Sequence, residues 1–271
     1  TGVQTCALPI CYIDAQGGPT HRLALCFDSL LKIRESEFPA GSFDLFLDEA
    51  DQGLKHLLLG GTCGKEGKRP ALQAKAKWGV QNARRIFIAS AGLSEAEIDL
   101  PCTLGGETPY VIQNQHQSQG YPCTLYTDNP DGGDRRLARG QVFAQLQQAL
   151  AEGQRAIVHT DTKASAYLVE ALAMECGVLP DQVLRYDGDT SSEPLQREFA
   201  DNPNQFLTDH PIQLVVASPS LTSGVSITGD FFDVVFGIFE GQTIAPDDAM
   251  QMLHPYRPLV PRIVSAPAIG K

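Results

Sequence analysis

The sequence has no long hydrophobic run and no surplus of positive charge. None of its apolar stretches approaches the roughly 18–20 residues that a helix needs to cross a bilayer, so we expect a cytoplasmic protein without membrane contacts. The 271 residues carry a formal net charge of -11, which gives no overall basic field to attract nucleic acid. A basic patch confined to one groove would still be compatible with this charge.

The cysteines lack the spacing of a metal site or of a disulfide framework. They stand at positions 6, 11, 26, 63, 102, 123 and 176, and no two form a C-x-x-C pair. We therefore expect reduced thiols, as in cytosolic proteins. His21, His159 and His210 also have no partner at ligand spacing, which indicates ordinary polar roles.

The stretch TGVQTCALPI, residues 1–10, has neither a periodic apolar pattern nor the anatomy of a signal peptide. It resembles the translation of a sequencing-adapter oligonucleotide read in one frame. We expect it to be foreign to the natural protein and the gene to be a fragment; a genuine irregular N-terminus is the alternative.

Short apolar runs that end in small or acidic residues recur through residues 11–100. They cover 23–27, 42–50 and 86–89, and helix-length segments separate them. This alternation predicts an α/β protein with a parallel sheet, whose functional residues lie at the carboxyl ends of the strands.

Residues 101–138 are rich in Gly, Pro, Asn and Gln, which predicts an interdomain connection with some β-structure. The alternation resumes over 139–264, and 265–271 are expected to be a tail. Helices are predicted at 140–153 and 163–177 and from Asp247 or Asp248, and strands within 155–161, 182–190, 212–227 and 231–239.

Two adjacent carboxylates, Asp48 and Glu49, follow the strand-like run FDLFL. In nucleotide-hydrolysing sites, one carboxylate holds Mg²⁺, usually through water, and its neighbour polarises the attacking water. Asp48 would be the metal-side residue and Glu49 the water-side residue. The alternative is an acidic helix start, where both side chains would favourably meet the helix dipole.

Three further polar segments follow strands. Ser90 and Ala91, in SAG, would suit a relay between a nucleotide site and a nucleic-acid path, or form a plain turn. SPSLTSGVSI, at 218–227, offers amides and hydroxyls to phosphates, although an ordinary polar loop has the same composition. In QMLHPYR, at 251–257, Arg257 is either an arginine finger for a γ-phosphate or a surface arginine.

In this order, the segments resemble the core of a superfamily 2 helicase over residues 21–264. CFDSL is similar to motif Ib, LDEAD to motif II, SAG to motif III, IVHTDTKASA to motif IV, SPSLTSGVSI to motif V and QMLHPYR to motif VI. A narrower resemblance is to the helicase modules of plasmid replication proteins, which are of the cyanobacterial replication protein A type and are kin to the herpesvirus origin-of-replication binding protein. It rests on the stretches DEADQGLKHLLLGGTC, SPSLTSGVSI and FGIFEGQTIAPDDAMQML.

The resemblance implies an α/β fold of two RecA-like parallel-sheet domains, the first truncated at its N-terminus. It implies ATP and Mg²⁺ as cofactors, and single-stranded or forked DNA and replication proteins as partners. The implied catalytic residues are Asp48, which would also hold Mg²⁺ through water, Glu49, Gln251 and Arg257. Ser90 and Ala91 would couple the two sites. The implied nucleic-acid contacts are Ser29, Thr190, Ser218, Ser223 and Gly224.

Two features depart from the family pattern. No G-x-x-x-x-G-K-[ST] loop is present, because GGTCGKEGKR at 60–69 follows motif II and lacks the spacing. We expect this Walker A loop upstream of residue 11, so that the fragment alone does not hydrolyse ATP. Pro255 replaces the first Arg of Q-x-x-x-R-x-R, and proline also breaks a helix interior. A sequencing error, drift towards inactivity, or a finger role for Arg257 alone would each explain Pro255.

Two rival functions belong to other classes. A non-catalytic nucleic-acid-binding or scaffolding module would have kept the fold and lost the chemistry, which Pro255 and the missing loop favour. A small-molecule enzyme would need a nucleophile or cofactor fingerprint, and neither G-x-S-x-G nor G-x-G-x-x-G is present. Our hypothesis is a fragment of an ATP-dependent helicase that acts in plasmid or phage-like DNA replication.

Overall fold

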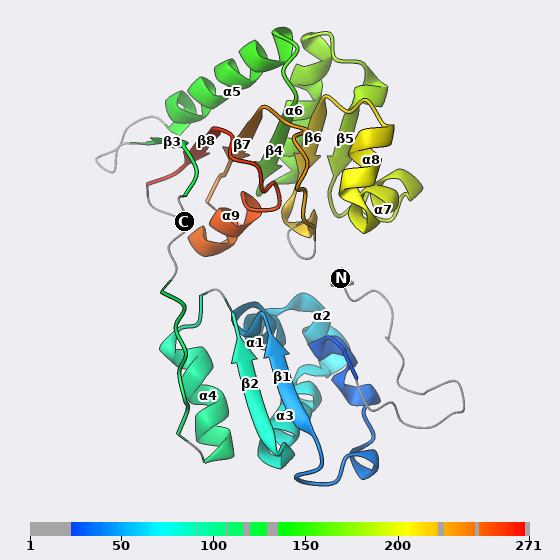
Figure 1. The fold of residues 1–271 in the computed structure, drawn as a ribbon, viewed down its shortest axis with the longest axis vertical. Coiled ribbons are helices and arrows are strands. Elements are labelled where there is room, and N and C mark those ends of the chain that lie inside the picture. Colours follow the sequence, from blue (N-terminus) through cyan, green and yellow to red (C-terminus); the bar gives the residue numbers. More distant parts are fainter. Residues whose placement is uncertain are drawn as a thin grey trace. The chain divides into compact units, whose positions relative to one another are not determined.

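The computed structural model describes residues 23–90, 92–106, 108–115, 120–128, 135–221, 225–241 and 244–268 (Figure 1). Contacts divide the chain into two compact units after Gln115, within the stretch expected as a connection. The described residues up to 115 are named the N-terminal unit, and those from 120 the C-terminal unit. Residues 1–10, expected to be foreign, lie outside the described part.

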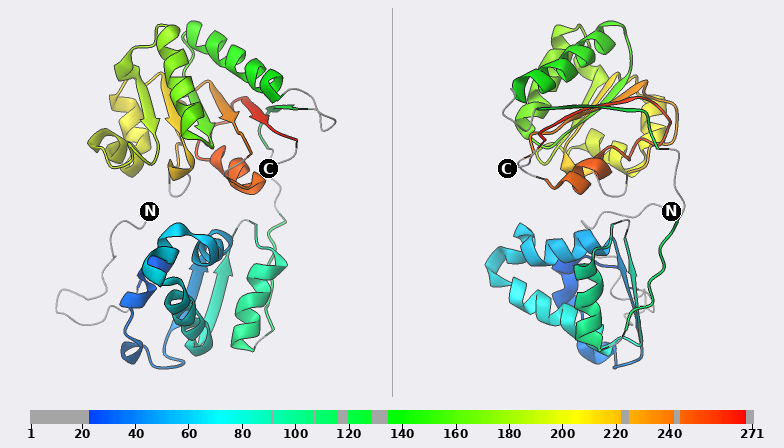
Figure 2. Two further views of the ribbon diagram at one scale, coloured as in Figure 1. Left: turned by 180° about the vertical axis from the view of Figure 1, so that it is seen from behind. Right: turned by 90° about the vertical axis from the view of Figure 1, so that its left-hand side faces the viewer.

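The N-terminal unit is built on two parallel strands, β1 (Asp44–Asp48) and β2 (Arg85–Ala89), whose carboxyl ends lie side by side. Helices cover one face of this sheet (Figure 2). On the other face Phe46 and Phe87 are exposed and stack with ring centroids 6.1 Å apart. The alternation of half-buried and exposed side chains along both strands follows from this one-sided cover.

The helices of the N-terminal unit begin and end at recognisable signals. Leu54 and Leu57 lie on the buried face of the helix that follows β1. The last helix opens with a capping contact, in which the Glu97 carboxylate accepts the Ser94 N–H at 2.8 Å. The bounds are α1 (Ala50–Leu59), α2 (Gly61–Gly64), α3 (Arg69–Asn82) and α4 (Glu95–Gly105), with 3₁₀ turns η1 (Phe27–Lys32), η2 (Glu35–Glu37) and η3 (Lys65–Gly67).

The strand predicted at 23–27 is wrong. The structure has only an isolated bridge position at Ala24, and η1 begins at Phe27. From this turn, Phe27 and Leu30 pack against a small core that includes Cys63. A strand would place successive side chains on opposite faces, whereas a 3₁₀ turn brings positions 27 and 30 to the same side. The apolar run therefore fills the core from a turn.

The C-terminal unit holds six parallel strands in the order β3-β8-β7-β4-β6-β5. The three central strands β4, β6 and β7 are fully buried, as expected of a parallel sheet that is covered on both faces. They confirm the strands predicted within 155–161, 212–227 and 231–239. The bounds are β3 (Cys123–Thr127), β4 (Ala156–Thr160), β5 (Val183–Tyr186), β6 (Leu214–Ala217), β7 (Val234–Ile238) and β8 (Arg262–Ala266).

Helices pack on both faces of this sheet (Figure 2). Val158 of β4 belongs to one hydrophobic core with α5 and α6, and the preceding Ile157 belongs to a second core with α7 and α8. Successive residues of one strand thus supply opposite layers. The bounds are α5 (Arg135–Ala151), α6 (Lys163–Glu175), α7 (Pro194–Asp201), α8 (Pro203–Asp209) and α9 (Pro246–Met252), with 3₁₀ turns η4 (Pro180–Gln182) and η5 (Pro219–Leu221).

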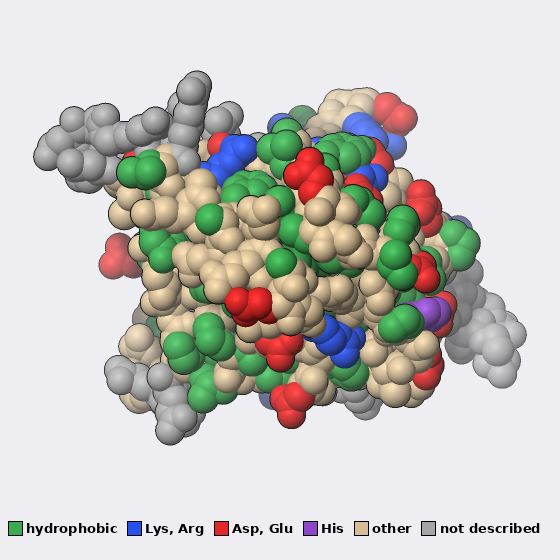
Figure 3. Space-filling model, turned by 90° about the horizontal axis from the view of Figure 1, so that it is seen from above, with side chains coloured by type: hydrophobic (Ala, Val, Ile, Leu, Met, Phe, Trp, Pro, Cys, Tyr) green, Lys and Arg blue, Asp and Glu red, His purple; other side chains and the backbone are tan. Residues whose placement is uncertain are grey.

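Within the described ranges, no helix has the length and apolar character needed to cross a membrane. Figure 3 shows one face of the molecule, on which Lys and Arg side chains are dispersed among acidic and apolar ones. That face therefore presents no gathered basic patch.

Candidate functional site

The junction between β1 and α1 carries Asp48 and Glu49. Glu49 has a left-handed backbone, with φ 49° and ψ 48°, and its side chain makes no capping hydrogen bond. A capping residue normally has an extended backbone and accepts a bond from the first turn. A left-handed residue other than glycine costs about 1–2 kcal/mol, and such residues cluster at functional sites. The Glu49 side chain therefore does not cap the helix that it precedes.

Carboxylates gather at this strand end. Desolvation, together with the charges of Asp51 and Asp48, raises the pKa of the Glu49 carboxyl above its usual value. Asp48 and Glu49 are both exposed, and the Glu49 N–H donates to Asp48 Oδ1 at 3.2 Å. A carboxylate with a raised pKa takes up a proton more readily, which suits a group that activates water.

A hydrogen bond joins this strand end to the end of β2. The hydroxyl of half-buried Ser90, directly after β2, donates to Asp51 Oδ1 in the first turn of α1. The Gly92 N–H in turn lies 3.4 Å from Ser90 Oγ. The structure thus brings the LDEAD and SAG segments together; Ala91 of the latter lies outside the described residues.

Thr190 is buried in the loop after β5 rather than displayed on the surface. Its hydroxyl donates to the Arg185 carbonyl at 2.9 Å and accepts the Asp187 N–H at 3.0 Å. Hydrogen bonds from backbone N–H groups lower the pKa of the buried Asp187 carboxyl, although burial itself acts in the opposite direction. The Thr190 side chain therefore fixes the shape of its loop.

The other residues that were predicted to contact nucleic acid belong to both units. Ser218 is buried just after β6, with its Oγ 2.8 Å from Ser220 Oγ. Ser29 lies half-buried in η1 of the N-terminal unit. Ser223 and Gly224 lie outside the described residues.

Arg257 directly follows Tyr256, which takes part in an isolated β-bridge. A parallel bridge pairs Ile227 with Tyr256, and the Arg257 N–H donates to the Ile227 carbonyl at 2.8 Å. The Arg257 side chain is exposed, with Nε 3.4 Å from Ser226 Oγ. The bridge fixes the backbone of Arg257 while its guanidinium faces solvent.

Gln251 and Pro255 lie on either side of the end of α9 at Met252. Gln251 is half-buried in the last turn of the helix. Pro255 is buried beyond it, and its carbonyl accepts the Ile227 N–H at 2.8 Å. Pro255 interrupts no helix, because α9 has already ended, and a proline shortly after a helix end is common.

A polar network lies at the carboxyl ends of β4 and β7, and its residues were not predicted from the sequence. Buried Asp161 accepts the Glu240 N–H at 2.9 Å and the Gly241 N–H at 3.0 Å. The Glu240 carboxylate accepts from Arg139 and from the Ser165 hydroxyl. The available signal was the strand-end acid in IVHTD, which has the same form as the acid in LDEAD.

A small, open pocket with a cavity volume of about 30 Å³ adjoins this network, at the carboxyl ends of β3, β7 and β8. Its lining mixes charged and apolar side chains, namely Asp128, Ala138, Arg139, Phe239, Glu240, Ser265, Ala266 and Pro267.

The sequence matches no protein-family model and shows no significant similarity to a curated protein. Solved structures show the fold. S. cerevisiae Dbp5 bound to RNA and ADP BeF3 is 14% identical with a TM-score of 0.55 over 90% of this chain. Mycobacterium smegmatis helicase Lhr bound to ssDNA and AMP-PNP is 16% identical (TM-score 0.53, 88%), and helicase MrfA bound to DNA is 15% identical (TM-score 0.56, 94%).

The chain spans 57% of the Dbp5 chain, 30% of Lhr and 34% of MrfA. The fold is therefore that of the RecA-like α/β domains found in helicases, with parallel sheets, as the sequence predicts.

Proposed function

We propose that this chain is part of an ATP-dependent nucleic-acid helicase or translocase that acts in plasmid or phage-like DNA replication. The observation that carries the proposal is the group at the end of β1, where strained Glu49 stands between Asp48 and an Asp51 that is bonded to Ser90. The comparisons support it, since Dbp5 and Lhr are bound to a nucleic acid and to a nucleotide analogue.

The strand-end residues fit a nucleotide with Mg²⁺. Exposed Asp48 would hold Mg²⁺ through water, and the ion would neutralise charge on the phosphates. Glu49 would orient the attacking water and accept its proton. Gln251 and Arg257, whose side chain is exposed, are the further catalytic residues of the proposal, with Arg257 as the arginine finger.

The proposed partner is single-stranded or forked DNA, with replication proteins beside it. Ser29, Ser218, Ser223 and Gly224 would contact the strand, and Thr190 would act by shaping its loop. Ser90 and Ala91 would transmit changes between the nucleotide and the strand.

The proposed enzyme needs a phosphate-binding loop beyond this chain. Residues 60–69 run from the end of α1 through α2 and η3 to the first residue of α3, whereas a Walker A loop joins a strand to a helix. The chain alone should therefore not hydrolyse ATP.

The alternative is a non-catalytic nucleic-acid-binding or scaffolding module, which the replacement of a motif VI arginine by buried Pro255 favours. The helicase and the nucleic-acid-binding form of the alternative both require binding of single-stranded nucleic acid. The first test is fluorescence anisotropy of labelled single-stranded DNA with this chain at several salt concentrations, together with an ATPase assay. We expect salt-dependent binding without hydrolysis. Absence of binding would contradict the helicase and leave only a scaffolding module, and hydrolysis by this chain would contradict the need for an external loop.

A further inference from the structure

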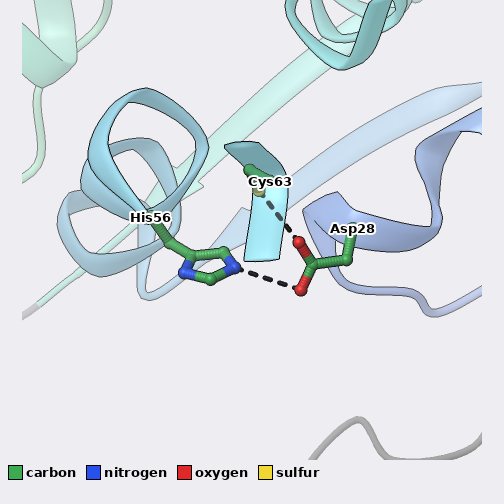
Figure 4. A group of neighbouring side chains, drawn as sticks. All are labelled: Asp28, His56 and Cys63. Atoms are coloured by element: carbon green, nitrogen blue, oxygen red, sulfur yellow. Dashed lines mark hydrogen bonds and ion pairs between the residues drawn. The ribbon is translucent and has the colours of Figure 1, made fainter. Parts of the chain in front are cut away.

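Three side chains of the N-terminal unit converge from separate segments. Asp28 comes from η1, His56 from α1 and Cys63 from α2, and they point towards one another (Figure 4). One potential ligand atom of each, a carboxylate oxygen, an imidazole nitrogen and the thiol sulfur, lies within 4.8 Å of the other two.

The contacts within this cluster are short. Cys63 Sγ lies 2.9 Å from Asp28 Oδ1, and His56 Nε2 lies 3.1 Å from Asp28 Oδ2. The ligand atoms of a tetrahedral zinc ion lie about 3.3–3.8 Å apart, as follows from bonds of about 2.0–2.3 Å. Shifts of a few tenths of an ångström would therefore open these separations to the geometry of a zinc site.

We propose that Asp28, His56 and Cys63 bind a divalent zinc-like ion in the N-terminal unit. Sulfur and imidazole ligands select Zn²⁺ over Mg²⁺ or Ca²⁺, which prefer oxygen ligands only. A thiolate and a carboxylate neutralise the two positive charges of the ion. The three ligands leave a fourth position of the tetrahedron for water, since Asp28 is exposed to solvent while Cys63 is buried.

The surroundings support this geometry. The Thr62 hydroxyl lies 3.0 Å from Asp28 Oδ1 and 3.1 Å from Oδ2, so it would keep one carboxylate oxygen oriented. A Cβ at Gly60 would collide with the His56 ring and with its carbonyl oxygen, so glycine leaves the room that the ring occupies.

The ion would tie three short segments together. Cys63 belongs to the small core of this unit with Leu57 and Leu72, and Phe27 beside Asp28 packs against that core. A metal bound by the folded unit alone stabilises it by mass action. The proposed ion would therefore stabilise the folded unit, and one of its ligands, His56, lies on the helix that follows Asp48 and Glu49.

The test uses the whole chain after removal of metal by a chelator. Addition of Co²⁺ should give a thiolate-to-cobalt charge-transfer band in the near ultraviolet, and Zn²⁺ should abolish it at one equivalent. His56→Ala and Asp28→Asn should weaken zinc binding at least tenfold, measured by competition with a chromophoric chelator. Cys63→Ser should lose the band.

Cys102→Ser and His210→Ala are matched controls outside the cluster and should bind as the wild type does. Circular dichroism confirms that each variant is folded; should Cys63→Ser fail to fold, the two surface variants decide. Absence of the charge-transfer band in the wild type, or wild-type zinc affinity in both His56→Ala and Asp28→Asn, would overturn the proposal and leave a hydrogen-bonded cluster.

Discussion

The hydroxyl of Ser90 donates a hydrogen bond to the carboxylate of Asp51, and this contact joins the ends of two neighbouring strands. It is the physical link between the LDEAD and SAG segments. The proposed coupling of nucleotide and nucleic acid would use this bond to transmit a change from one strand end to the other.

Ser90→Ala removes this bond to a charged acceptor and should lower the free energy of unfolding of the N-terminal unit by about 1 kcal/mol. Trp78, the single tryptophan, stacks on Phe43 at 5.7 Å, so its fluorescence in urea reports on this unit. Ser192→Ala, at an exposed position of the C-terminal unit, is the control. An unchanged urea midpoint for Ser90→Ala would show that the contact contributes nothing.

Glu49→Gly relieves the left-handed strain and should stabilise the N-terminal unit by about 0.5–1 kcal/mol, after the greater chain entropy of glycine is deducted. Glu49→Ala keeps the strain and should not. Glu66 also has a positive φ, of 55°, so Glu66→Gly is a matched control that should gain stability outside the strand-end group. Urea unfolding followed by Trp78 measures both. Equal free energies of unfolding for Glu49→Gly and Glu49→Ala would show that the left-handed backbone at position 49 carries no strain.

His159 should make the C-terminal unit sensitive to acid. Burial, with the charge of Arg262, lowers the pKa of His159 from 6.5 to about 3. The folded unit therefore favours the neutral ring, so the stability that His159 contributes is complete above pH 6.5 and is lost as the pH falls towards 3. The loss reaches at most about 1.4 kcal/mol per pH unit.

His159→Leu should flatten this dependence, whereas His210→Leu, at a half-exposed position, should not. Thermal unfolding followed by far-ultraviolet circular dichroism between pH 7 and 4 measures the effect. Trp78 fluorescence reports the unfolding of the N-terminal unit, so that its contribution can be distinguished from that of the C-terminal unit. An acid response in His159→Leu equal to that of the wild type would assign the sensitivity to other groups.

The sequence predicted β4, β6 and β7 because AIVHT, LVVA and VVFGI are buried on both faces and therefore read as continuous apolar runs. It did not predict β8, whose last residues lie in the stretch 265–271 that was expected to be a tail. It missed α7 and α8, which are short, although Pro194 and Pro203 at their first positions were available signals. The run at 23–27 was misread because apolar content alone does not distinguish a short strand from a 3₁₀ turn.

Asp48 and Glu49 were predicted because they follow an apolar run directly, whereas Asp161, which follows the run AIVHT in the same way, was missed. The cluster of Asp28, His56 and Cys63 was not predicted. His56 and Cys63 follow Asp28 by 28 and 35 positions, which is much farther than the ligand spacings of metal-binding motifs. Only the packing of η1 against α1 and α2 brings them together.

The proposed function rests on the action of Asp48 and Glu49 in ATP hydrolysis. The most direct measurement is single-strand-stimulated ATP hydrolysis by a longer protein in which an upstream G-x-x-x-x-G-K-[ST] loop precedes this chain. Glu49→Gln and Arg257→Ala should each lower the turnover number at least about 100-fold, because each removes a group that acts on the reacting phosphate or water. Glu175→Gln and Arg197→Ala, at exposed positions on α6 and α7, should keep wild-type rates. Hydrolysis unaffected by Glu49→Gln, or none in a folded protein with a complete loop, would contradict the account and favour the non-catalytic binding module.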